Sequence, residues 1–160
     1  MSVGNSTQAV NFGRKDLTLV LGQNLDLGGD DTGARNGTGK TTIINALSYA
    51  LYGEALTKIR KDNLINKTNA KNMLVTIEFE NAGVDYKIER GRKPNTVAFY
   101  VGGQEQEITD ESQGDSRETQ AEIERMLNMR HAMCKHIVAL NTYTEPFLSL
   151  RANDQRTIIE

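Results

Sequence analysis

The chain lacks several features that would assign it to a specialised class of protein. It has one cysteine, Cys134, so it cannot form an intrachain disulfide framework or a multi-cysteine zinc site, which fits a reducing compartment. No apolar run approaches the roughly 18 residues that a membrane-spanning helix requires. Residues 1–6 also lack the basic and apolar character of a secretory signal. We therefore expect a cytoplasmic protein with no membrane partner.

The chain also lacks an excess of basic residues. Its 19 Lys and Arg residues are offset by 21 Asp and Glu residues, which gives a net charge of −2. This balance does not indicate a nucleic-acid-binding protein, so any DNA contact must be local. At 160 residues and 38% hydrophobic composition, the length and composition are those of one ordinary folded unit.

Proline is scarce, with 2 residues, whereas glycine is abundant, with 14, and half of the glycines cluster between residues 22 and 53. Residues 17–21 form a short apolar run, which predicts a buried strand. Residues 22–37 are polar and rich in glycine, which predicts a loop. An amphipathic helix is expected from Thr41 to Gly53, because apolar side chains recur there at helical spacing: Ile43, Ala46, Leu47, Ala50 and Leu51.

A phosphate-binding loop follows the predicted strand, with alanine in place of the usual first glycine. It consists of Ala34, Arg35, Asn36, Gly37, Thr38, Gly39, Lys40 and Thr41, followed by Thr42. The glycines let backbone N–H groups turn toward an anion at a helix N-terminus. Lys40 is placed to reach the β and γ phosphates of ATP, the Thr41 hydroxyl to ligate Mg²⁺, and Thr42 to contact the α phosphate. The competing interpretation is a glycine-rich helix entry that binds nothing.

The middle of the chain predicts an antiparallel meander. Apolar and polar residues alternate at 75–79 and 84–88, and a turn lies between the two runs. Further turns precede a strand at 97–101 and a short segment around Ile108.

The C-terminal third predicts helices and loops. Asp115 and Glu118 resemble a capping box for a helix whose inner face holds Ile123, Met126 and Leu127. Residues 132–140 begin with helical character and end as an apolar run, and a polar loop follows. Asn153 and Asp154 are candidate caps for a last helix. His131 and His136 are expected to be surface helix residues.

Basic residues exceed acidic ones, nine to five, between residues 58 and 93. The candidates for contact with DNA phosphates are Lys58, Arg60, Lys61, Arg92 and Lys93. A solvated sheet face is an equally good interpretation, because no aromatic residues are interleaved for base stacking.

The segment from Asn36 to Gly53 resembles the N-terminal ATPase segment of the SMC-like family, particularly SbcC-type and bacteriophage recombination exonuclease ATPase subunits. The likeness extends over nearly the whole chain through Tyr86 to Arg90, residues 92–95, residues 137–140 and residues 147–150. It implies an α/β P-loop fold, namely the N-terminal lobe of an ABC-type ATPase head with an antiparallel β subdomain. The P-loop core would span about residues 9–66, the meander about 73–108 and a helical and loop segment about 115–160.

The resemblance also implies a function. ATP would clamp two heads together as a homodimer, and hydrolysis would act on a partner nuclease at DNA ends, in the host cytoplasm if the protein is phage-encoded. Lys40 would be catalytic. The resemblance implies a strand at residues 137–140, and Asn141 follows it. Asn141 occupies the position of a family glutamine that contacts Mg²⁺ and the attacking water, although a loop-start asparagine is an equal alternative.

Besides Asn141, the sequence departs from the family pattern in two further respects. An acidic insertion at residues 22–33 precedes the phosphate loop and is expected to be a gate to the nucleotide or, more simply, a surface loop. The acidic Walker B strand, the signature segment and the switch histidine of the family do not occur in this sequence. We therefore expect half of an ATPase head, a fragment that binds ATP without efficient turnover.

The alternative functions are half of a transport-type ABC ATPase and a nucleotide-sensing module without hydrolysis. A P-loop kinase or GTPase fits the meander less well.

Overall fold

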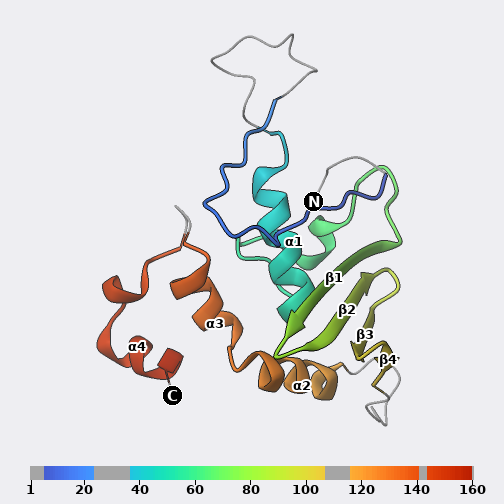
Figure 1. Cartoon of the computed structure of the whole chain (residues 1–160). Coiled ribbons are helices and arrows are strands. Elements are labelled where there is room, and N and C mark those ends of the chain that lie inside the picture. Colours follow the sequence, from blue (N-terminus) through green and yellow to red (C-terminus); the bar gives the residue numbers. More distant parts are fainter. Residues whose placement is uncertain (1–5, 24–36, 107–115, 141–143, 160) are drawn as a thin grey trace.

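The computed structural model describes residues 6–23, 37–106, 116–140 and 144–159. Its elements combine helices with one antiparallel sheet, which fits an α/β protein (Figure 1). In chain order they are α1 (Lys40–Tyr52), the 3₁₀ helix η2 (Lys61–Leu64), β1 (Met73–Asn81), β2 (Val84–Arg92), β3 (Thr96–Val101), β4 (Gln104–Glu105), α2 (Arg117–Leu127), α3 (His131–Met133), the π-helix η3 (Cys134–Val138), the 3₁₀ helix η4 (Phe147–Ser149) and α4 (Ala152–Ile159). No helix among these residues is long and apolar enough to cross a membrane.

The predicted meander is confirmed. The sheet has the order β1-β2-β3-β4, and each strand pairs antiparallel with the next. Ile88 on β2 is paired with Ile77 on β1 and with Phe99 on β3, so these three apolar side chains cross the inner face in one row. The predicted segment around Ile108 lies outside the described residues.

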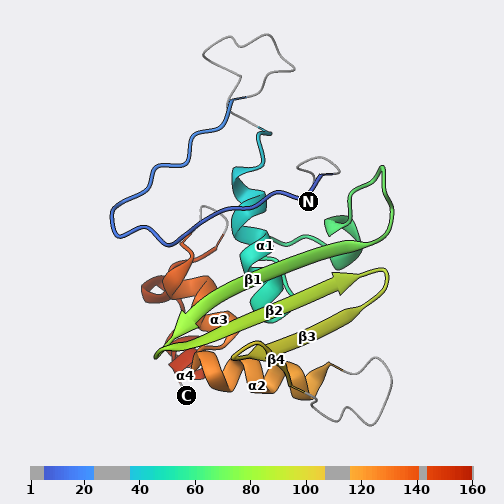
Figure 2. The ribbon, with the colours of Figure 1, turned by 45° about the vertical axis from the view of Figure 1, so that its right-hand side comes forward.

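The core lies between the inner face of the sheet and two helices. Figure 2 shows α1 behind the sheet and α2 along its β3–β4 side. The buried cluster consists of Leu51, Tyr52, Ile88, Phe99, Ile123 and Cys134. The ring of Tyr86 stacks on Phe79 and on Phe99, at centroid distances of 5.5 and 6.0 Å. Only the C-terminal half of α1 reaches this core, so the helix is anchored at that end.

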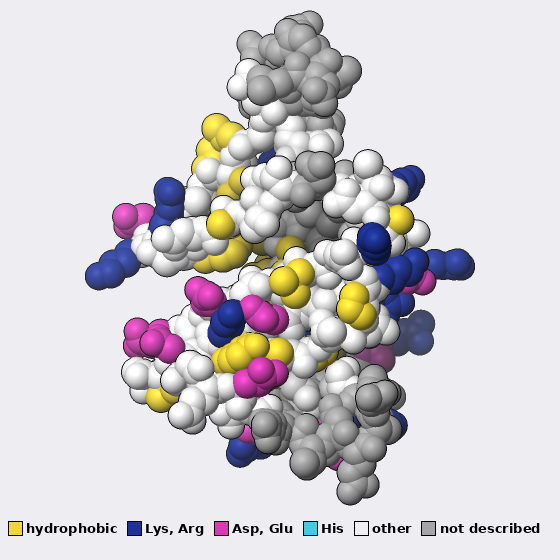
Figure 3. Space-filling model, turned by 90° about the vertical axis from the view of Figure 1, so that its right-hand side faces the viewer, with side chains coloured by type: hydrophobic (Ala, Val, Ile, Leu, Met, Phe, Trp, Pro, Cys, Tyr) yellow, Lys and Arg dark blue, Asp and Glu magenta, His cyan; other side chains and the backbone are white. Residues whose placement is uncertain are grey.

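The outer face of the sheet is acidic. Lys87 lies there among carboxylates, 2.7 Å from Glu89, and its ammonium group is 5.0 Å from the centroid of the Tyr100 ring. On the same face the outward positions of β1 and β2 hold Glu78, Glu80 and Asp85. Figure 3 shows acidic side chains gathered on one part of the surface and Lys and Arg side chains along another margin. The molecule therefore separates its charges despite its low net charge.

The prediction of a buried strand at residues 17–21 is wrong. These residues form no strand, and Leu17 is completely exposed, at 102%. A buried strand of this type needs partner strands on its edges and helices on its faces. No described strand lies beside residues 17–21, so the apolar run has no sheet to enter.

The family resemblance also implied a strand at residues 137–140, and this too is wrong. The chain continues from α3 into the π-helix η3, and Ile137, Val138 and Leu140 are exposed. No described strand is available to pair with this segment. Its backbone N–H and C=O groups bond within the helix instead, for example Ala139 N–H to Cys134 O at 2.8 Å.

The remaining helices agree with the sequence in part. The predicted amphipathic helix is confirmed as α1, which ends at Gly53 with a left-handed φ of 69°. Helix α2 buries Ile123 and packs Met126 and Leu127 on the core, as predicted. Its proposed cap, Asp115, lies outside the described residues. Asn153 and Asp154 lie inside α4, which begins at Ala152, so neither is its N-terminal cap.

Candidate phosphate-binding site

The phosphate loop leads directly into the first turn of α1. Gly37 and Gly39 have φ values of +73° and +87°, which an L side chain rarely adopts. The N–H groups of Thr42 and Ile43 donate to Gly39 O at 3.0 and 3.3 Å, so the helix is closed immediately after the second glycine. The predicted residues Ala34, Arg35 and Asn36 lie outside the described residues. The geometry of residues 37–42 is that of a glycine-rich turn at a helix N-terminus.

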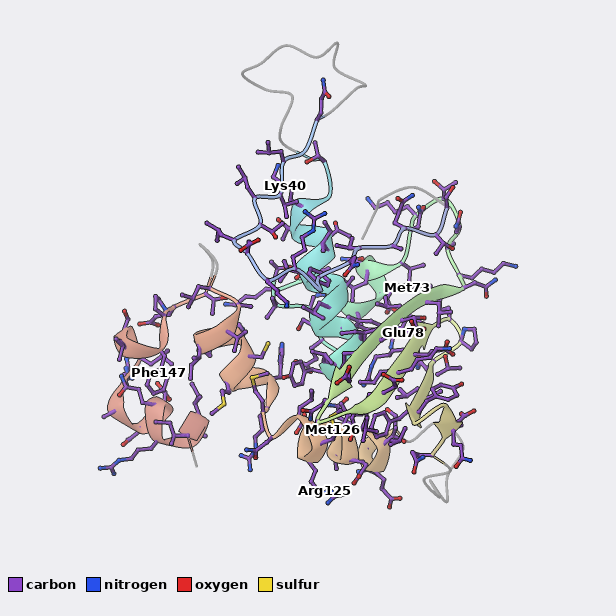
Figure 4. All side chains as sticks on the ribbon, in the orientation of Figure 1. Lys40, Met73, Glu78, Arg125, Met126 and Phe147 are labelled. Carbon is purple, nitrogen blue, oxygen red and sulfur yellow. The ribbon has the colours of Figure 1, made fainter. Side chains whose placement is uncertain are left out.

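Lys40 lies at the N-terminal end of α1, far from α2 (Figure 4). Its ammonium group donates to the Thr38 hydroxyl at 3.2 Å, so its charge stays over its own loop. Thr41, the first residue after Lys40, is exposed, whereas Thr42 is partly buried. A lysine ammonium group, an accessible hydroxyl and a helix N-terminus form a set of groups that suits a nucleoside triphosphate with Mg²⁺.

The segment before the loop closes against it at Gly22. A Cβ atom placed on Gly22 would lie 1.9 Å from the Thr38 hydroxyl oxygen and 2.6 Å from Thr38 Cβ. Because Cβ atoms do not approach other heavy atoms so closely, only glycine fits at this contact. The end of residues 17–21 therefore adjoins the phosphate loop, as the strand–loop–helix prediction required, although the strand itself does not form.

The C-terminal end of α1 is held by two side chains that sequence reasoning missed. Arg90 of β2 donates through Nε to Ala50 O at 3.1 Å and through Nη2 to Gln120 Oε1 at 2.6 Å. Gln120 of α2 donates through Nε2 to Leu51 O at 3.2 Å. Arg90 is only 6% exposed, and burial lowers the pKa of its guanidinium, an effect that Tyr49 opposes. The sequence did hold one signal for this contact: Arg90 is a charged residue at a position of the alternating β2 pattern that faces inward.

His131 is not the surface residue that the sequence suggested. Its Nε2 atom is 3.2 Å from the Ser48 hydroxyl, and its Nδ1 atom is 3.4 Å from a Glu54 carboxylate oxygen. The Ser48 hydroxyl donates to Glu54 O at 2.7 Å, so Nε2–H of the imidazole donates to Ser48. The ring also lies against Tyr52, at a centroid distance of 5.2 Å. His131 thus ties α3 to the middle of α1.

His136 is partly buried, and its Nδ1 atom is 2.7 Å from Glu145 O. Asn141, the predicted catalytic and Mg²⁺-contacting residue, lies outside the described residues. Within the described ranges there is no group of three or more His, Cys, Asp or Glu residues that could hold a metal ion.

The predicted DNA residues lie along two neighbouring segments. Arg92 at the end of β2 bonds to Asp62 of η2 through two nitrogens, at 2.9 and 3.2 Å, and these bonds lower the pKa of the Asp62 carboxyl. Lys61 lies 3.9 Å from Glu54. Lys61 and Arg92 both line a groove of about 600 Å³ that is also bordered by α2. The remaining candidates, Lys58, Arg60 and Lys93, are exposed.

Comparison with known proteins decides the family. The sequence profile of the AAA domain matches residues 1–156. The chain belongs to the AAA domain family. Over 162 residues and its full length, this AAA domain is 35% identical to exonuclease subunit 2 of Enterobacteria phage T4, of which it covers 26%. It thus spans about a quarter of that relative's length.

Two relatives from cellular organisms support the same family assignment. The AAA domain is 29% identical over 139 residues, 78% of this chain and 11% of the relative, to the SbcC component of the SbcCD nuclease of Clostridium acetobutylicum. It is 30% identical over 97 residues, 59% of this chain and 8% of the relative, to the DNA double-strand break repair Rad50 ATPase of Methanococcus maripaludis. The resemblance to SMC-like, SbcC-type ATPases is confirmed.

The partly buried position of His131 predicts a pH dependence of stability. Burial lowers the pKa of His131 below its ordinary value of 6.5, and the Glu54 carboxylate raises it in part. Below that ordinary value the unfolded chain binds the proton more readily than the folded chain, so stability falls as pH falls. The midpoint of thermal unfolding in wild type should therefore drop between about pH 7.5 and about pH 5.5, and His131→Gln should reduce that drop.

The matched control is His136→Gln, which removes the other histidine but leaves the contacts of His131 intact. It should keep the wild-type dependence of the unfolding midpoint on pH. Equal slopes for wild type and His131→Gln would contradict the prediction.

Proposed function

We propose that this AAA domain is the ATP-binding part of a DNA repair or recombination ATPase that works with a nuclease. The observation that carries the proposal is the turn at Gly37 and Gly39, which delivers Lys40 and Thr41 to the N-terminus of α1. The names of the relatives, an exonuclease subunit and a component of a nuclease, support the nuclease partner. They also favour this role over a transport-type ABC ATPase or a nucleotide sensor.

In this proposal the loop residues divide the work of holding ATP. Residues 34–39 would supply backbone N–H groups to the phosphates, and Lys40 would neutralise charge at the β and γ positions. Thr41 holds Mg²⁺ through its hydroxyl, Thr42 contacts the α phosphate, and Asn141 orients water near the metal. Bound Mg²⁺ supplies charge neutralisation on the phosphate oxygens.

We further propose that the chain is the N-terminal lobe of an ABC-type ATPase head. The lobe comprises a P-loop core at about residues 9–66, a meander at about 73–108 and a helical segment at about 115–160. Hydrolysis then requires a C-terminal lobe and a second head, which together supply the acidic strand and the signature segment. The larger size of the relatives supports this division, since the chain covers 26% of the phage protein.

The separation of acidic and basic residues on the surface supports one particular margin as the binding surface for DNA. The outer sheet face, with Glu78, Glu80 and Asp85, repels a phosphate backbone. The segment at residues 58–61 and the end of β2 carry Lys58, Arg60, Lys61, Arg92 and Lys93, and the Arg92–Asp62 ion pair joins the two. We therefore propose that DNA phosphates meet the margin formed by these basic residues.

Lys40→Ala tests the nucleotide site. Loss of one charged hydrogen-bonding partner of the phosphates should weaken ATP binding by about 10- to 100-fold, as measured by equilibrium dialysis with Mg²⁺. Lys71→Ala is the matched control, because Lys71 is an exposed lysine outside the loop, and it should bind ATP as wild type does. Unchanged affinity in Lys40→Ala would contradict the proposal.

Turnover tests the need for a second lobe. The 160-residue chain alone should bind ATP but release phosphate no faster than its Lys40→Ala variant, because the proposal assigns the groups that polarise the attacking water to the C-terminal lobe and the second head. A phosphate-release assay measures both proteins side by side. Robust hydrolysis that depends on Lys40 would overturn the proposed division of the head.

Gly22→Ala tests the contact behind the loop. The added methyl group collides with Thr38, so the phosphate loop must shift and ATP affinity should fall by about tenfold. Leu21→Val is the control, since Leu21 is the exposed neighbouring residue and the change adds no atoms. If Gly22→Ala and Leu21→Val bind ATP equally well in the dialysis measurement, residue 22 does not position the loop.

A further inference from the structure

We infer that Arg90 and Gln120 are positioning residues for the nucleotide: they set the placement of the phosphate loop by fixing the opposite end of α1. This inference rests on the proposed function, because it assigns two positioning residues to the proposed ATP site. Neither residue is near Lys40, which lies at the other end of the helix (Figure 4). A 13-residue α-helix is about 20 Å long, so any influence must pass along α1.

The contacts form a closed unit at the last turn of α1. Arg90 bonds to Ala50 O and to Gln120, and Gln120 bonds to Leu51 O, so two carbonyls that no longer have helical partners are satisfied from β2 and α2. The Tyr49 hydroxyl adds a bond to Gly91 O at 3.3 Å. Two elements, β2 and α2, therefore converge on the C-terminal end of α1.

Gly53 leaves the space that the guanidinium fills. A Cβ atom on Gly53 would lie 2.8 Å from Arg90 Nη1, and the φ of +69° at this residue also disfavours a side chain. The glycine that ends the helix thus also admits the arginine. The helix end and Arg90 fit together in one arrangement.

The buried charge of Arg90 favours one position of α1 relative to β2. In the described part of the chain no carboxylate lies within ion-pair distance of Arg90, although its side chain is almost completely buried. A buried cation without a carboxylate is costly, and here the negative end of the α1 dipole and the carbonyl oxygens offset that cost. Any displacement of α1 relative to β2 removes the compensation. Arg90 therefore favours a single position of the helix.

A rigid helix that is held at one end and binds phosphate at the other couples the two sites. If the Arg90 contacts fix the position of α1, their loss weakens nucleotide binding, and bound nucleotide in turn stabilises the Arg90 contacts. A helix cap of purely local importance would instead affect only the last turn of α1 and the overall stability.

The experiment compares Arg90→Lys and Gln120→Ala with Arg125→Ala in the 160-residue chain. Arg125 is the matched control, because it is an exposed arginine of α2 with two bonds to Glu122, on the side of the helix away from the sheet (Figure 4). ATP affinity is measured at a temperature where circular dichroism shows each protein folded. Hydrogen exchange without nucleotide is followed separately at the first and last turns of α1.

We expect both site variants to bind ATP about fivefold more weakly or worse, the lower end of coupling between distant sites, with Arg125→Ala unchanged. We also expect faster exchange at the first turn of α1, not only at the last turn. If Arg90→Lys does not fold, Gln120→Ala, which removes no buried charge, decides the outcome.

Faster exchange confined to the last turn, together with unchanged ATP affinity, would overturn the inference and leave a local cap. If wild type binds no ATP, the proposed function fails by itself. The nucleotide-free exchange at the first turn then still decides whether Arg90 and Gln120 position the loop.

Discussion

The contact between α1 and the inner face of the sheet is the constraint on which the other features depend. Leu51 and Tyr52 of the last turn belong to the same buried cluster as Ile88 and Phe99. Apolar burial alone is non-directional and would permit the helix to slide or rotate. The bonds from Arg90 and Gln120 to the final carbonyls add direction, so the helix axis is fixed as well as buried.

This arrangement explains which features the sequence could predict. The hairpin, α1 and its end at Gly53 follow from local patterns: alternation with period two, helical spacing and a glycine at positive φ. The phosphate loop could be predicted because its chemistry requires adjacent residues, and its role in binding stays a prediction. The predictions that failed, at residues 17–21 and 137–140, concerned strands whose formation depends on partner strands elsewhere in a sheet.

The tertiary contacts of the site were less accessible from sequence. His131 meets Ser48 and Glu54 across more than 75 residues of chain, and no spacing rule relates them. Arg90 carried a partial signal, since Tyr86 and Ile88 define the inward face of β2 and Arg90 continues it. A cation at such a position demands a polar acceptor in the core. Sequence could indicate that an acceptor exists, but only the fold identifies it as the C-terminal end of α1.

The two ends of α1 differ in how firmly they are held. All residues from Ser48 to Tyr52 are buried, whereas Lys40 to Ile44 are exposed or partly exposed. Regions with few buried contacts open at a lower free-energy cost than the core does. The end of α1 that carries the predicted phosphate loop is therefore the end at which a ligand's interaction energy would be large relative to the local stability. If the loop binds nucleotide as proposed, the directional bonds at the core-facing end would transmit the order gained at the loop to β2 and α2, because they prevent the helix from absorbing it by moving.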